Sequence, residues 1–244
     1  MVKKTDPFKF MQCVSIVKST GKNAKNLSEL RTIISEVSDE SIFHHVYQYF
    51  LKGHILEYTN DFAHWAGEHL EESALAERLT SIDPYTGEYV DEKVLDERLA
   101  KAEPYTHESV NKVRKELIRK IDDFLKEYPE PRDVVRGNEF YFHETVNLVF
   151  PVGVKAENLA EFLVAIEHID AGSIYYHFYE SRVRLGEGVS DDFSRWIEHT
   201  LFKKKVADRI RAIDPFMHSI KSVRENIKSI IEESVRADME GVAD

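Results

Sequence analysis

The 244-residue sequence contains a single cysteine, Cys13, and this scarcity excludes two kinds of site. A chain with one cysteine forms no intramolecular disulfide and builds no cage of several thiolates around a metal. Long apolar runs are absent too, since none approaches the ~18 residues of a membrane span. The first residues carry charge without an apolar core, so we expect no secretory signal. These features favour a cytoplasmic protein without a membrane partner.

Positive charge is also scarce in this sequence. Lysine and arginine total 33 against 44 acidic residues, and the formal net charge is -11. A general nucleic-acid binder needs a basic face that displaces counterions from phosphate. The tight basic run at 203–205 is better explained as a solvated helix start. We therefore expect no nucleic-acid partner.

The sequence does contain an internal repeat. The stretch 41–65 recurs in shortened form at 173–196, and about a third of paired positions are identical over roughly 65 residues. The matched pairs include Phe8 and Phe140, Gly21 and Gly153, Asn26 and Asn158, His45 and His177, Asp61 and Asp192, and Trp65 and Trp196. Self-similarity on this scale indicates two copies of one folding unit.

The repeat predicts a mainly α-helical fold built as a tandem duplication with pseudo-two-fold symmetry. Asn26 and Asn158 are expected to cap a helix in each copy. Aromatic and β-branched residues at 8–17 and at 140–150 leave room for one short strand opening each copy. We expect a first copy at residues 1–128 with an insertion at 86–103, a linker at 129–139, and a second copy at 140–244.

Residues kept in both copies are expected to serve the shared fold. His45 and His177 follow a core isoleucine on the same helical face, and Asp61 and Asp192 begin the next helix. A buried imidazole that hydrogen-bonds to an aspartate or a helix cap explains this pattern. The same reasoning places Trp65 and Trp196 in the core as structural residues.

Histidines concentrate in the first copy, and this difference points to a ligand site. His44, His45 and His54 are accompanied by Glu57, whereas the second copy has Tyr176 in place of His44. Imidazole and carboxylate are the usual ligands of zinc and iron, so His44, His54 and Glu57 are a candidate divalent-metal site. Alternatively, a pocket for a small polar ligand would use His44, His45, His54, Tyr47, Tyr58 and Asp61. A purely structural or surface role for the cluster remains the third alternative.

Catalytic signatures are missing from the sequence. It contains no Walker loop, no dinucleotide-binding glycine motif and no nucleophile elbow. Cys13 lies in an apolar segment, which is typical of a small core residue rather than a nucleophile. The sequence therefore favours a protein that is not an enzyme.

The chain resembles a prokaryotic family known only as a domain of unknown function. The resemblance covers most of the chain and rests on residues 26–30, on 41–45 with His54, and on 60–65. More loosely, 173–177 and 192–196 resemble a small helical module appended to varied bacterial proteins. Such a module implies regulation or interaction more than chemistry, and the insertion at 86–103 departs from it.

The leading functional hypothesis is a soluble, non-catalytic helical protein that binds a partner protein or a small ligand. The first alternative is a metal-dependent enzyme or metal-binding protein that uses His44, His54 and Glu57. The second is a subunit of a larger assembly that docks through the insertion at 86–103 or through an acidic face.

Overall fold

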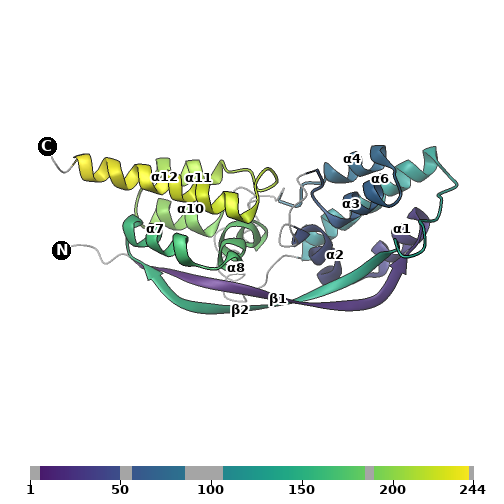
Figure 1. Cartoon of the computed structure of the whole chain (residues 1–244), viewed down its shortest axis with the longest axis horizontal. Coiled ribbons are helices and arrows are strands. Elements are labelled where there is room, and N and C mark those ends of the chain that lie inside the picture. The colour runs from purple at the N-terminus through teal and green to yellow at the C-terminus, as the bar shows by residue number, and fades with distance from the viewer. Residues whose placement is uncertain (1–5, 50–56, 86–106, 185–189, 242–244) are drawn as a thin grey trace. The chain divides into compact units, whose positions relative to one another are not determined.

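The computed structural model describes residues 6–49, 57–85, 107–184 and 190–241. Two strands of 17 residues each, β1 (Phe8–Ala24) and β2 (Phe140–Ala156), pair as an antiparallel two-stranded sheet (Figure 1). The fold is therefore mixed α and β, with 58% helix and 17% strand, and the prediction of a mainly α-helical fold was wrong. The expected insertion at 86–103 lies outside the described residues.

β1 extends beyond residue 17, where its predicted apolar pattern ends. Side chains in this polar part of β1 form bonds to the opposite strand. Lys18 forms an ion pair of 2.7 Å with Glu144, and the Thr20 hydroxyl donates to the carbonyl of Phe142. Such cross-strand pairs stabilise a sheet where side-chain burial does not. A sequence pattern that counts only apolar positions ends the strand too early.

The helices form two compact units. The unit that we call the first unit contains the helices of the first copy. These are α1 (Leu27–Glu36), α2 (Asp39–Val46), α3 (Asp61–Glu68), α4 (Ser73–Thr80) and α6 (His107–Glu127). Asn26 caps α1 by accepting a hydrogen bond from the backbone of Glu29, as predicted, and α3 packs on α4.

The second unit contains the helices of the second copy. They are α7 (Leu159–His168), α8 (Ala171–Ile174), a π-helical turn (Tyr175–Glu180), α9 (Ser181–Arg184), α10 (Asp192–His199), α11 (Lys204–Arg211) and α12 (Ile220–Gly241). Asn158 caps α7 in the same way as Asn26 caps α1. The pairs α10 with α11 and α7 with α12 repeat the packing of the first unit.

The two copies exchange the beginnings of their strands. β1 belongs to the second unit up to Val14 and to the first unit from Ser15 onward. Conversely, β2 belongs to the first unit up to Asn147 and to the second unit from Leu148 onward. Each helical unit is thus completed by the strand start of the other copy. The division at 129–139 stays a prediction about the repeat along the sequence.

Glycines at equivalent positions of the two strands explain one of the matched pairs. Gly21 and Gly153 have φ angles of +74° and +78°, a region that side chains with a Cβ rarely enter. Both strands therefore need glycine at this point.

Gly172 of α8 allows β1 to approach closely, and its replacement by alanine is expected to destabilise the second unit. A Cβ at this position would lie 2.5 Å from the carbonyl oxygen of Cys13, so backbone would have to move. We expect Gly172→Ala to lower the free energy of unfolding by about 1–3 kcal/mol in urea titrations. The matched control is Glu40→Ala at the equivalent, exposed position of the first copy. Equal stability of the two variants would contradict the close approach.

Candidate functional site

The histidine common to both copies holds the exchanged strand. In the first unit, His45 Nδ1 lies 2.6 Å from Asp61 Oδ2, and His45 Nε2 accepts the backbone N–H of His143 in β2 at 3.0 Å. In the second unit, His177 Nδ1 lies 2.8 Å from Asp192 Oδ2, and His177 Nε2 accepts the N–H of Met11 at 2.8 Å. Since the pattern is the same in both units, these bonds belong to the shared fold.

The geometry requires a neutral imidazole at this position. A ring nitrogen that accepts a backbone N–H carries no proton of its own. In agreement, burial lowers the pKa of His177, and this outweighs the opposing influence of Asp192. In each unit the aspartate binds Nδ1 and fixes the tautomer, and Nε2 binds the backbone of the strand.

The tryptophans of the repeat lie next to the same strands. Trp65 Nε1 donates to the carbonyl of Asn138 at 2.7 Å, and Trp196 Nε1 donates to that of Asp6 at 2.9 Å. Both rings pack against phenylalanines, Phe140 in the first unit and Phe162 in the second. Each tryptophan therefore anchors the start of the strand that comes from the other copy.

His44 begins a buried polar network in the first unit. Its Nδ1 lies 2.5 Å from the Thr145 hydroxyl and 3.3 Å from Oε1 of Gln48. The Gln48 amide in turn donates to Ser15 at 3.1 Å and to Asn147 at 2.9 Å. This network joins α2 to the middle of both strands.

A third histidine, His143, completes a cluster that the sequence did not indicate. One ring nitrogen from each of His44, His45 and His143 lies within 4.8 Å of the others. His143 escaped notice because it belongs to the second copy in sequence, and only the strand exchange brings it to the first unit. The sequence signal for this site is a difference between the copies, because the second has His143 where the first has Met11.

The other predicted ligands are not brought to this cluster by the described residues. His54 lies outside the described part of the chain, and Glu57 is exposed in a turn. Tyr47 is buried, and this burial raises the pKa of its hydroxyl. The Tyr58 hydroxyl donates to Glu68 at 3.0 Å.

In the second unit, a phenol and a carboxyl group occupy the positions of His44 and Gln48. Tyr176 and Glu180 stand where the first copy has His44 and Gln48, and both lie in the π-helical turn. Burial raises the pKa of Glu180 to about 8. Arg184 pairs with Asp192 at 2.7 Å and stacks over Tyr176 with 4.7 Å to the ring centroid. The two units therefore share one scaffold but have diverged in their buried polar groups.

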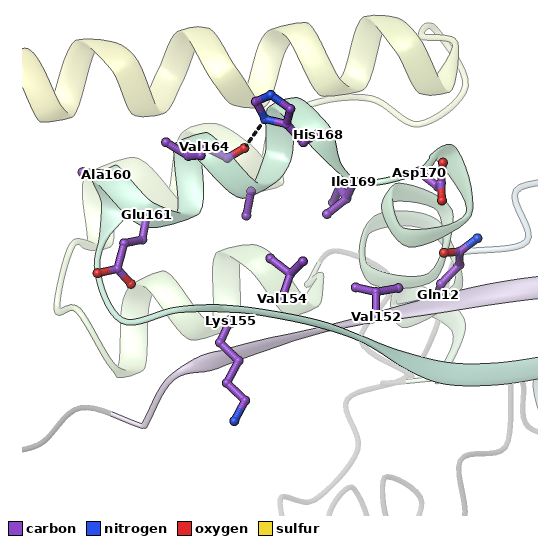
Figure 2. A pocket seen from close by; sticks show the side chains of 11 residues that line it. Gln12, Val152, Val154, Lys155, Ala160, Glu161, Val164, His168, Ile169 and Asp170 are labelled. Atoms are coloured by element: carbon purple, nitrogen blue, oxygen red, sulfur yellow. Dashed lines mark hydrogen bonds between the residues drawn. The ribbon is translucent and has the colours of Figure 1, made fainter.

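The second unit has a concave groove on its surface. It lies between β2 and α7, has a volume of about 720 Å³, and is open to solvent (Figure 2). Its apolar lining consists of Val152, Val154, Ala160, Val164, Ala165 and Ile169. Val164 is 61% exposed and Val154 is 38% exposed, which is high for aliphatic residues.

The equivalent surface of the first unit is polar and is crossed by an ion pair between two side chains. Threonine and lysine, Thr20 and Lys22, replace Val152 and Val154, while Ser28 and Thr32 replace Ala160 and Val164. Lys22 reaches across from the strand to Glu36 of α1 and forms an ion pair of 2.9 Å. Only the second unit thus offers an apolar groove at this position within the described residues.

Comparison with known proteins supports the duplication and the predicted resemblance. A model described as "Family of unknown function (DUF5752)" matches residues 5–92 and again residues 85–232. The solved structure of OrfY from Thermoproteus tenax is similar to this chain with 32% identity and a TM-score of 0.70. The similarity covers 95% of this chain and 97% of that one. No curated protein matches the chain. Among the described residues, no helix has the length and apolarity that crossing a bilayer requires.

Proposed function

Because the chain belongs to the DUF5752 family, whose function is unknown, we propose a function from its structure: a non-catalytic protein that binds an amphipathic helix of a partner protein. The binding site is the groove between β2 and α7 of the second unit. A cytoplasmic location, which the sequence led us to expect, is part of this proposal.

The observation that carries the proposal is the difference between the two copies. The same scaffold closes this surface with Lys22 and Glu36 in one unit and leaves it apolar in the other. Exposed aliphatic side chains lower solubility, and covering them with a partner removes apolar surface from water. An apolar groove rimmed by polar residues is therefore typical of an interaction site. A duplicated fold that needs the apolar surface for its own stability would carry it in both copies.

The shape and charge of the groove favour a helix as its occupant. The groove is open along one side and lined by aliphatic residues from a helix and a strand, which suits the apolar stripe of an amphipathic helix. Lys155 and His168 also line the groove, whereas acidic side chains stand at its two ends, Glu161 at the start of α7 and Asp170 beyond its end (Figure 2). Together with the net charge of -11, these two acidic ends favour a helix with lysine or arginine flanking its apolar residues.

A binding role also agrees with what the repeated histidines do. His45 and His177 each use both ring nitrogens to hold an aspartate and a strand. A general base needs a nitrogen within reach of a substrate proton. If the wild-type protein converted a substrate and His44→Ala or His54→Ala abolished this activity, the result would favour the enzymatic alternative.

Binding to a defined peptide tests the proposal. The probe is a fluorescein-labelled helical peptide with leucines at i, i+3, i+4 and i+7 and lysines at both ends, followed by fluorescence anisotropy. We expect saturable binding that weakens at least tenfold in Val154→Lys/Val164→Thr, which installs the residues of the first copy. Burying two aliphatic side chains contributes about 1.5–3 kcal/mol each, and 1.4 kcal/mol is a factor of about ten.

Two controls make the result specific to the groove. Val135→Thr alters a valine that is 75% exposed in the first unit and should leave the affinity unchanged. A peptide of the same composition with its leucines out of helical register should bind weakly. Equal binding by wild type and by the groove variant would refute the proposal, and displacement by a small apolar compound alone would favour a small ligand.

A further inference from the structure

We propose that His44, His45 and His143 form a binding site for a transition-metal ion of the zinc class in the first unit. One ring nitrogen of each histidine lies within 4.8 Å of one from each of the other two, and the three side chains come from α2 and β2. In a tetrahedral site with zinc–nitrogen bonds of about 2.0–2.1 Å, neighbouring nitrogens stand about 3.3 Å apart. Binding an ion would therefore draw these nitrogens together by up to about 1.5 Å.

Groups behind the histidines orient them as metal ligands require. Metal-bound imidazoles usually donate their second nitrogen to a carboxylate, a carbonyl or a water. Asp61 holds Nδ1 of His45 at 2.6 Å, which directs Nε2 of the same ring away from the carboxylate and toward β2. The Thr145 hydroxyl lies 2.5 Å from Nδ1 of His44 and fixes that ring in the same way. Two of the three ligands are therefore already oriented.

The second unit serves as an internal comparison without these ligands. Tyr176 replaces His44 and Met11 replaces His143, and only His177 remains. His177 still binds its aspartate and the N–H of Met11. The fold therefore requires one histidine at this position, and the other two histidines of the first unit exceed that requirement.

Metal binding would compete with one bond of the fold. His45 Nε2 accepts the N–H of His143 at 3.0 Å, so coordination through this nitrogen exchanges that bond for a bond to the metal. His143 contributes both the N–H of that bond and a ring nitrogen of the cluster. An ion held by His44 and His45 of α2 and by His143 of β2 would join the two elements in place of that bond. The site lies in the first unit and is independent of the groove.

Cobalt titration of the full chain tests the site. Chelator-treated protein is titrated with Co²⁺, whose visible absorption reports coordination, and Zn²⁺ is then added to displace it. We expect one equivalent of Co²⁺ to bind, and we expect His143→Met and His44→Tyr each to weaken this binding at least tenfold. Both variants install the residue found at the equivalent position of the second unit, and circular dichroism checks their folding.

The control is His199→Gln, which removes an exposed histidine at the end of α10 and should leave the titration unchanged. Absence of saturable binding by the wild type would overturn the proposal. Binding of equal strength in His143→Met would overturn it as well, because the ion would then use other histidines. Loss of the signal in both variants with retained folding would establish the cluster as the site.

Discussion

Replacement of His177 by alanine is expected to lower the free energy of unfolding by about 3 kcal/mol. The variant loses the bond to Asp192 and leaves the N–H of Met11 without its acceptor in the second unit. A buried donor without a partner costs about 1–3 kcal/mol, and the cavity left by the ring adds to it. Asp192 keeps its ion pair with Arg184, which limits the loss.

Urea denaturation of the full chain, followed by circular dichroism, measures this effect. His199→Ala is the matched control, because this exposed histidine ends α10, the helix that Asp192 begins. Its free energy of unfolding should stay within about 0.5 kcal/mol of wild type. A His177→Ala protein as stable as this control would show that the strand does not depend on the imidazole.

The same histidine gives the wild-type protein a dependence on acid. Burial lowers the pKa of His177 in the folded state, whereas an unfolded histidine titrates near pH 6.5. Below this pH the unfolded chain binds a proton that the folded chain does not, so stability falls as pH falls. We expect wild type to lose more stability than His177→Ala between pH 7 and pH 5. An equal loss in both proteins would assign the dependence to other groups.

The repeat could be predicted from the sequence because its positions match at a constant offset. The same match gave the helix caps Asn26 and Asn158, whose side chains accept bonds from Glu29 and Glu161. Because His45 and Asp61 recur in the second copy, the sequence also predicted a buried imidazole bonded to an aspartate, and the two groups lie 2.6 Å apart. These features are local or follow directly from similarity between the copies.

The strand exchange could not be predicted in this way. A strand that packs on its own helices and one that packs on the helices of the other copy have identical sequence patterns. Only the structure shows that His45 binds the N–H of His143 rather than that of Met11. For the same reason the sequence could not place His143 beside His44, and the metal ligands were sought at His54 and Glu57 instead.

The groove was missed for a different reason. Val154 and Val164 are apolar, and a sequence analysis assigns apolar residues at helical or strand spacing to the core. Their exposure became evident only in the structure. The sequence does show that Lys22 and Thr32 of the first copy are replaced by Val154 and Val164 in the second. Such differences between copies indicate positions where the two copies can differ in function.

Replacement of Glu180 by glutamine is expected to stabilise the protein at alkaline pH. Burial raises the pKa of Glu180 to about 8, against the opposing influence of Arg184 and of a bond to Cys13. An unfolded glutamate titrates near pH 4.3, so between this pH and about 8 the folded chain holds a proton that the unfolded chain releases. Stability contributed by the protonated carboxyl is therefore lost as pH rises through this window.

Glutamine keeps the shape of the side chain and cannot ionise, and the first copy already carries Gln48 at the equivalent position. We expect Glu180→Gln to raise the free energy of unfolding by on the order of 1–3 kcal/mol at pH 8 and to change it little at pH 4.5. Urea titrations at pH 4.5, 7 and 8 measure the difference, with Glu232→Gln on the exposed face of α12 as the control. A variant less stable than wild type at pH 8 would mean that the carboxylate is ionised in the fold and that its attraction to Arg184 outweighs burial. In that case the second unit would hold a true buried ion pair where the first unit has a neutral amide, and the copies would differ in charge as well as in chemistry.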